Sequence, residues 1–155
     1  MEPRFEFVSQ RHTAYSEIGC GVAATLMLLN AAKYSTPRSF KQMGKLLRVD
    51  VPPKKKWGPK FGEYGNGAYA RDITTYFSDN AISHISIADE AKSDLSWKLL
   101  KILLSNPPLM VGMKNNPTAW SEGGHWIVIV QGAPNSLRYY DPYQKKGEVF
   151  EFELP

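Results

Sequence analysis

The sequence contains only one cysteine in 155 residues, so it cannot form a disulfide within the chain. It has three scattered histidines and no C-x-x-C or H-E-x-x-H spacing, so we expect no metal site. No Gly-rich phosphate loop follows a strand, and we expect no cofactor. No stretch approaches the roughly 20 apolar residues that a membrane span needs, and the start MEPRFEFVSQ does not resemble a signal peptide. We therefore expect a soluble protein without a membrane partner, either cytoplasmic or delivered by a route that uses no signal peptide, with a free thiol.

The composition is that of a globular protein, with 43% hydrophobic and 22% charged residues, and we expect a single domain over residues 1–155. The formal net charge is +4, and basic residues are concentrated in 52–71 among several aromatic residues. This stretch contains Lys54, Lys55, Lys56, Lys60 and Arg71, with Trp57, Phe61, Tyr64 and Tyr69. It is interpreted either as a solvated surface loop or as a surface that tracks phosphates and stacks bases, so a nucleic acid partner stays open.

The hydrophobic pattern predicts helices first and a sheet afterwards. Helical spacing predicts helices over 20–33, 37–48 (capped by Thr36), 68–80 and 93–104 (capped by Ser93), while 52–67 is predicted to be loop. Content of β-branched residues predicts a short strand at 82–87, and extended segments follow at 108–113, 125–130, 137–141 and 147–154. The predicted class is α+β, with N-terminal helices packed on a C-terminal antiparallel sheet.

Cys20 lies at the start of the first predicted helix, between Gly19 and Gly21. The glycines leave the backbone free to turn and to approach another molecule closely. A helix N-terminus carries partial positive charge and unpaired N–H donors, which favour a thiolate. Cys20 is therefore a candidate nucleophile, and the alternative at this point is an inert cysteine that packs in an Ala-rich helix.

His125 follows two glycines and opens a strongly apolar strand, unlike His12 and His84, which stand in no such context. An imidazole there can take the thiol proton and return it to a leaving amine. Asp141 ends the next predicted strand, 16 residues later, and its carboxylate would orient that imidazole. The alternatives are a histidine that only caps the strand and a D-P turn without a further role.

The register between these two strands decides whether His125 and Asp141 meet. A regular hairpin with a two-residue turn at 134–135 pairs His125 with Gln144 and places Asp141 on the opposite face. A meeting of the two residues therefore requires a shift by an odd number of residues, through a three-residue loop at 132–134 or a β-bulge.

Acyl transfer also needs donors for the oxyanion, and Gln10 is the candidate for a side-chain amide, with Gln131 and Gln144 as alternatives. Gln10, CGVAATLMLLN, GGHWIVIVQG and YYDPY together resemble the C39 and C39-like branch of the papain-like cysteine peptidases, in the same order along nearly the whole chain.

The resemblance implies a papain-like fold with Cys20 as nucleophile, His125 as base, Asp141 as the residue that orients it, and Gln10 in the oxyanion hole. Together with the glycine and charge patterns, it suggests a substrate-binding set of Gly21, Gly124, Trp126, Lys54, Lys55 and Lys56. Two features differ from the family: ten residues separate Gln10 from Cys20, and no transporter segment is attached, so export-coupled cleavage of leader peptides is not implied.

The expected function is a cysteine peptidase or related amide hydrolase that acts on a peptide or protein. The same scaffold carries other reactions, because fold does not determine function. One alternative is a bacterial toxin domain of the contact-dependent inhibition kind, which acts on tRNA, another RNA or a protein and is neutralised by an immunity protein or inhibitor. A second alternative is a binding module without catalysis, in which Cys20 is buried and faces away from His125.

Overall fold

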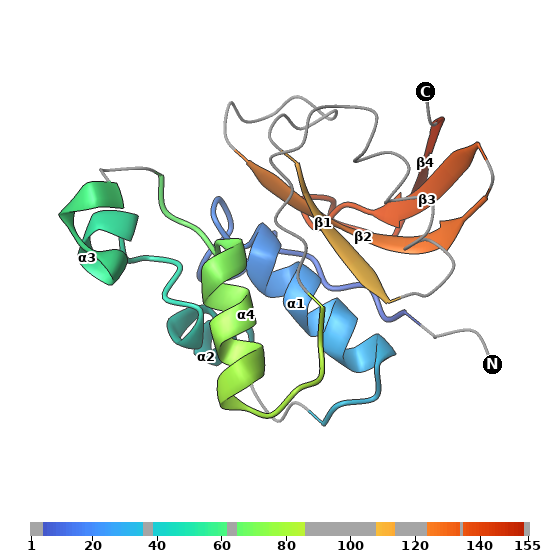
Figure 1. The fold of residues 1–155 in the computed structure, drawn as a ribbon. Helices are drawn as coiled ribbons and strands as arrows, with labels where there is room; N and C mark the ends of the chain where they lie inside the picture. The colour runs from blue at the N-terminus through green and yellow to red at the C-terminus, as the bar shows by residue number, and fades with distance from the viewer. Residues whose placement is uncertain are drawn as a thin grey trace.

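The computed structural model describes residues 5–35, 39–61, 65–85, 108–113, 124–133 and 135–153. Their architecture is α+β, with the helices on one side of the molecule and an antiparallel sheet on the other (Figure 1). The helices are α1 (Cys20–Ala31), α2 (Phe40–Leu46), α3 (Pro53–Trp57), the 3-10 helix η1 (Pro59–Phe61) and α4 (Ala70–Asp79). The strands are β1 (Leu109–Met113), β2 (His125–Gly132), β3 (Ser136–Tyr140) and β4 (Val149–Glu153).

The sheet has the order β1-β2-β3-β4, and each strand is antiparallel to its neighbour. Strands that follow one another in sequence are also neighbours in space, as expected for antiparallel strands joined by reversals of the chain. All four extended segments predicted in the C-terminal half, and their antiparallel pairing, are confirmed.

The pairing of β2 with β3 contains the irregularity that the sequence analysis required. One extra residue of β2, at Val130, shifts the register by one position. The pairs are Gly132↔Leu137 and Gln131↔Arg138 before the shift, and Ile129↔Tyr139 and Val128↔Tyr140 after it. The prediction of an odd shift is confirmed, and continuing this register places Asp141 opposite Ile127, on the same face of the hairpin as His125.

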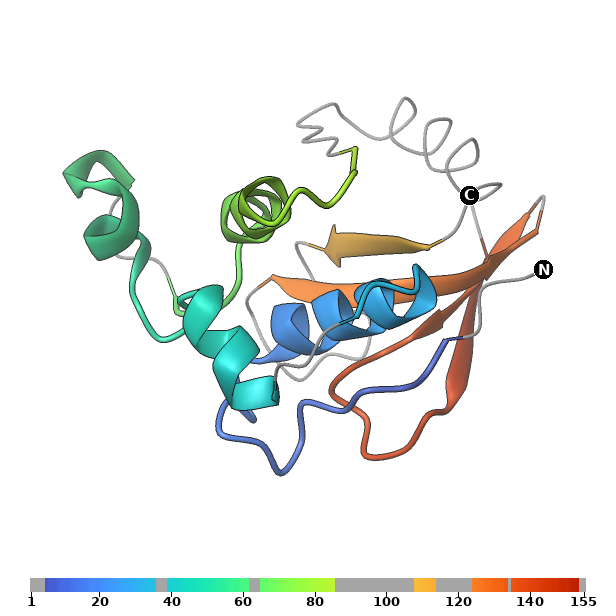
Figure 2. The same ribbon diagram turned by 90° about the horizontal axis from the view of Figure 1, so that it is seen from below.

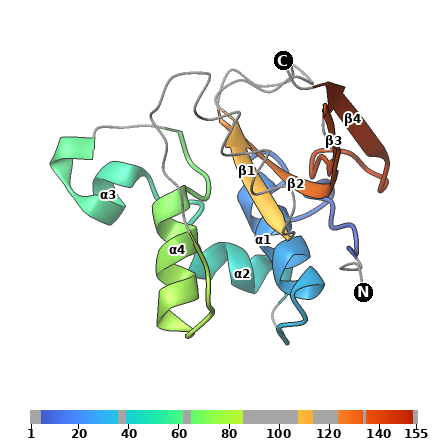
Figure 3. The ribbon, with the colours of Figure 1, turned by 45° about the vertical axis from the view of Figure 1, so that its right-hand side comes forward.

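Helix α1 packs along the sheet (Figure 2), and in the views of Figures 1 and 3 it stands between the sheet and α2 and α4. Nearly all of its residues are buried, because it is apolar around its whole circumference. Its Ala24 and Met27 pack against Val128 of β2, together with aromatic residues of the N-terminal segment. The helix that begins at Cys20 is therefore the central element of the fold.

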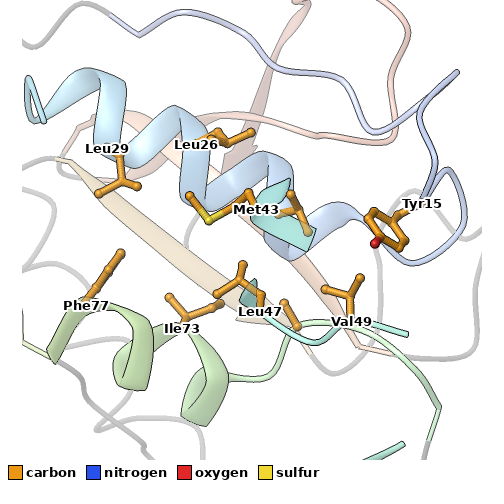
Figure 4. Packing of buried hydrophobic residues seen from close by; sticks show 10 residues of the cluster. Tyr15, Leu26, Leu29, Met43, Leu47, Val49, Ile73 and Phe77 are labelled. Atoms are coloured by element: carbon orange, nitrogen blue, oxygen red, sulfur yellow. The ribbon is translucent and has the colours of Figure 1, made fainter. Parts of the chain in front are cut away.

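The other side of α1 faces α2 and α4 across a second apolar cluster (Figure 4). The labelled side chains point into one shared space between the three helices: Tyr15, Leu26, Leu29, Met43, Leu47, Val49, Ile73 and Phe77. This packing fixes α1 from the side away from the sheet.

Several predicted elements differ from the structure. Helix α2 begins at Phe40 and is capped by Ser39 in a capping box with Gln42, and Thr36 lies outside the described residues. The predicted loop at 52–67 contains α3 and η1, so that prediction is wrong there. The described part of the predicted strand, 82–85, is not extended into a sheet, and the predicted helix 93–104 lies outside the described residues. Within the described ranges, no helix has the length and apolar character to cross a membrane.

Candidate functional site

Cys20 is the first residue of α1, and its side chain is 9% exposed. The preceding residue, Gly19, is the N-cap, and no side chain of the described residues caps this end of the helix. A β-carbon at Gly19 would lie 2.6 Å from the Tyr15 carbonyl oxygen and 2.9 Å from the Phe40 ring. Gly19 is therefore required for close packing, and Cys20 stands in the first turn of α1, where the backbone N–H groups have no partner within the helix.

His125 and Asp141 are brought together by the shifted register of β2 and β3. His125 is the first residue of β2, Asp141 follows β3, and both side chains are 0% exposed. His125 Nε2 donates a hydrogen bond of 2.6 Å to Asp141 Oδ1, and the Tyr143 backbone N–H donates one of 2.9 Å to the same oxygen. Because Nε2 is bound to the carboxylate, Nδ1 is the nitrogen that remains for Cys20.

The surroundings of His125 act on its pKa in opposite directions. Burial lowers the pKa, whereas the hydrogen bond with Asp141 and the interactions with Cys20 and with the Asp141 charge raise it, and the net result is a pKa of about 9. Cys20 is one of the groups whose interaction raises the pKa of His125, so its side chain lies near the imidazole. The structure therefore places Cys20 near a buried His125–Asp141 pair.

Gln10 lies beside the turn that follows β3, and it is fully buried. Its backbone N–H donates to the Pro142 carbonyl at 2.8 Å, and its side-chain Nε2 donates to the Ser16 carbonyl at 2.8 Å. The bond to Ser16 fixes the amide and leaves the second N–H of Nε2 for another acceptor. Gln131, one of the alternatives, is exposed and accepts a hydrogen bond from Arg138.

The sequence analysis did not identify the residues that join this N-terminal segment to the turn. Ser9 Oγ donates to the Gln144 carbonyl at 2.6 Å, and the Arg11 guanidinium lies 4.4 Å from the centre of the Tyr143 ring. These pairs are separated by more than a hundred residues, so no periodicity or local motif indicates them.

Gly21 and Trp126, which were predicted to contact substrate, pack against other parts of the chain. A β-carbon at Gly21 would lie 2.6 Å from Ala68 Cβ and 3.0 Å from Trp126 Cδ1. Trp126 is half-buried, and its Nε1 donates to the Ala68 carbonyl at 2.8 Å. Gly21 thus lets the segment around Ala68 and the indole of Trp126 approach α1, while Gly124 is exposed just before β2.

The three lysines predicted to bind substrate differ in their environment. Lys54 and Lys55 are exposed on α3. The ammonium of Lys56, by contrast, is fully buried and lies 2.8 Å from Asp72 Oδ2, so it does not belong to the solvent-facing basic surface that the sequence analysis expected. The burial of Lys56 corrects that part of the prediction.

Within the described part of the chain, no three His, Cys, Asp or Glu side chains are grouped so that they could hold a metal ion. Comparison of the chain with protein-family models, with curated proteins and with solved structures gave no match.

Proposed function

We propose that the protein is a cysteine peptidase or a related amide hydrolase, with Cys20 as nucleophile, His125 as general acid and base, and Asp141 as the residue that orients the imidazole. The observation that carries the proposal is the buried bond of 2.6 Å between His125 and Asp141, in a histidine that lies near Cys20. A carboxylate on one ring nitrogen and a thiol on the other are the arrangement that activates a sulfur nucleophile.

In the proposed reaction, the Cys20 thiolate attacks a substrate carbonyl carbon. A carbon–sulfur bond forms, and the carbonyl oxygen takes up the electron pair as an oxyanion. The carbon–nitrogen bond then breaks, and the proton on His125 Nδ1 passes to the leaving amine. Water attacks the resulting thioester, His125 takes one of its protons, and Cys20 leaves as the thiolate again.

Gln10 and the N-terminus of α1 would stabilise the oxyanion. The Cys20 backbone N–H and the second N–H of Gln10 Nε2 are the two donors proposed for it, and Ser16 holds the Gln10 amide in place. The positions of α1, of the sheet and of these four side chains are also compatible with the papain-like fold implied by the sequence resemblance. The papain-like assignment is part of the proposal.

Labelling with a peptidyl vinyl sulfone, followed by intact-mass measurement, tests the proposal. We expect a single adduct on the wild-type chain and none on Cys20→Ala. We expect His125→Ala to be labelled slower by about 100-fold or more, since general acid–base groups contribute on the order of 10² to 10⁴ in rate. His84→Ala is the matched control. Because His84 is exposed, we expect the His84→Ala chain to be labelled at the wild-type rate.

Two results would count against the proposal. The first is an adduct on Cys20→Ala at the wild-type rate, which would place the reactive group elsewhere. The second is unchanged labelling of His125→Ala, which would mean that the imidazole does not act on the thiol. Because the residues are proposed to act as a unit, the Cys20→Ala/His125→Ala chain should be no less reactive than Cys20→Ala alone.

A further inference from the structure

A cluster of basic and aromatic side chains lies on α3, η1 and the start of α4, outside the candidate site. We define this basic cluster as the exposed Lys54, Lys55, Lys60 and Arg71 around the half-buried Trp57 and Phe61. Residues 53–71 contain five lysines and arginines and one acidic residue, Glu63. Helix α3 is the helix farthest from the sheet, so the cluster stands at one end of the molecule (Figures 1 and 3).

The buried Lys56 fixes this cluster to the rest of the fold. Its ammonium donates to Asp72 Oδ2 at 2.8 Å and to the Gly67 carbonyl at 3.2 Å. Asp72 also accepts the Tyr69 backbone N–H, so one carboxylate joins α3 to the first turn of α4. The exposed cations are thus presented on a rigid support, which reduces the entropy that they lose on binding.

The aromatic rings of the cluster contact the cations of the chain itself. Arg71 lies 5.4 Å from the centre of the Trp57 ring and 5.3 Å from that of Phe61. Lys56 and Lys60 lie over the same two rings, at 5.5 and 5.0 Å respectively. A nucleic acid base would have to displace these cations in order to stack, so the cluster offers positive charge rather than a stacking platform.

We propose that the basic cluster binds an acidic segment of a partner polypeptide. Four exposed cations in a stretch with a single acidic residue, Glu63, are complementary to a run of carboxylates, and the Arg71 guanidinium suits bidentate contact with one of them. This proposal concerns binding only, and it stands or falls independently of the chemistry proposed for Cys20.

Fluorescence anisotropy tests it with a labelled Glu- and Asp-rich peptide and with a labelled oligouridylate of equal net charge. We expect the wild-type chain to bind the peptide more tightly than the oligouridylate, with an affinity that falls as salt is added. The Lys54→Gln/Lys55→Gln/Lys60→Gln chain should bind the peptide about tenfold more weakly, since three exposed ion pairs are removed.

The matched control removes three exposed lysines from other elements, Lys33→Gln/Lys41→Gln/Lys145→Gln, with the same change in net charge. We expect it to retain wild-type affinity for the peptide. Equal weakening in both triple variants would overturn the proposal, because only net charge would then matter. It would also be overturned if the wild-type chain did not bind the peptide at low salt, or if it bound the oligouridylate more tightly.

Discussion

Replacement of Asp141 by asparagine is expected to change the protonation of His125. The neutral amide keeps an oxygen that can accept from Nε2 but removes the negative charge. The rise in the His125 pKa from 6.5 to about 9 corresponds to roughly 3 kcal/mol in favour of the imidazolium. Burial disfavours the imidazolium, and in Asp141→Asn only Cys20 would still favour it. We therefore expect the His125 pKa in the variant to fall by at least about one unit.

The measurement is an NMR titration of labelled histidine, in a His12→Gln/His84→Gln background that leaves His125 as the only histidine. A second measurement is the free energy of unfolding as a function of pH. Because the folded pKa of His125 is raised, its stabilisation is fully present below pH 6.5 and is lost as the pH rises through about 9. The free energy of unfolding of the wild-type chain should therefore lose this contribution between pH 6.5 and about pH 9. In Asp141→Asn, most of this pH-dependent contribution should be absent. Identical His125 titrations in the two chains would refute the assigned role of the carboxylate.

Two further predictions concern stability and are measured by urea unfolding. Lys56→Met leaves the Asp72 carboxylate buried without its cation, so we expect the free energy of unfolding to fall by on the order of 3–5 kcal/mol. A fall no larger than that caused by an average surface substitution would contradict the structural role of the pair. Gly21→Ala places a β-carbon 2.6 Å from Ala68 Cβ and should cost about 1–3 kcal/mol. Gly65→Ala, where the new carbon meets open space, is its control, and equal midpoints for the two chains would count against the packing argument.

Much of the fold could be predicted because local pattern and tertiary structure agree. The apolar run after Cys20 forms a helix that starts at that residue, and all four C-terminal segments of extended character form strands. The bulge at Val130 was also predictable in kind, because a regular register would have separated His125 from Asp141. The position of the shift was not predictable, since several turn and bulge geometries shift the register by an odd number of residues.

The failures have a common physical cause, which is dependence on distant contacts. Residues 53–57 form a short helix although two prolines, Pro52 and Pro53, stand at its start and three lysines follow. Pro53 fits the first turn, and Lys56 forms an ion pair with Asp72 on α4. The segment after α4 has β-branched residues but no strand beside it in the described residues, and Ala81 reverses the chain there with a φ of 54°. Intrinsic preference alone does not make a strand without a partner to pair with.

The turn after β3 connects the two parts of the candidate site that lie farthest apart in sequence. Its Tyr143 backbone N–H holds the Asp141 carboxylate at 2.9 Å, and its Pro142 carbonyl holds the Gln10 backbone at 2.8 Å. Arg11 covers the Tyr143 ring from the N-terminal segment. A displacement of this turn would therefore move the carboxylate that orients the imidazole and the amide proposed for the oxyanion together. The N-terminal segment thus belongs to the site as much as α1, β2 and β3 do. It supplies the Gln10 amide directly, and it holds the Asp141 carboxylate in position through the turn.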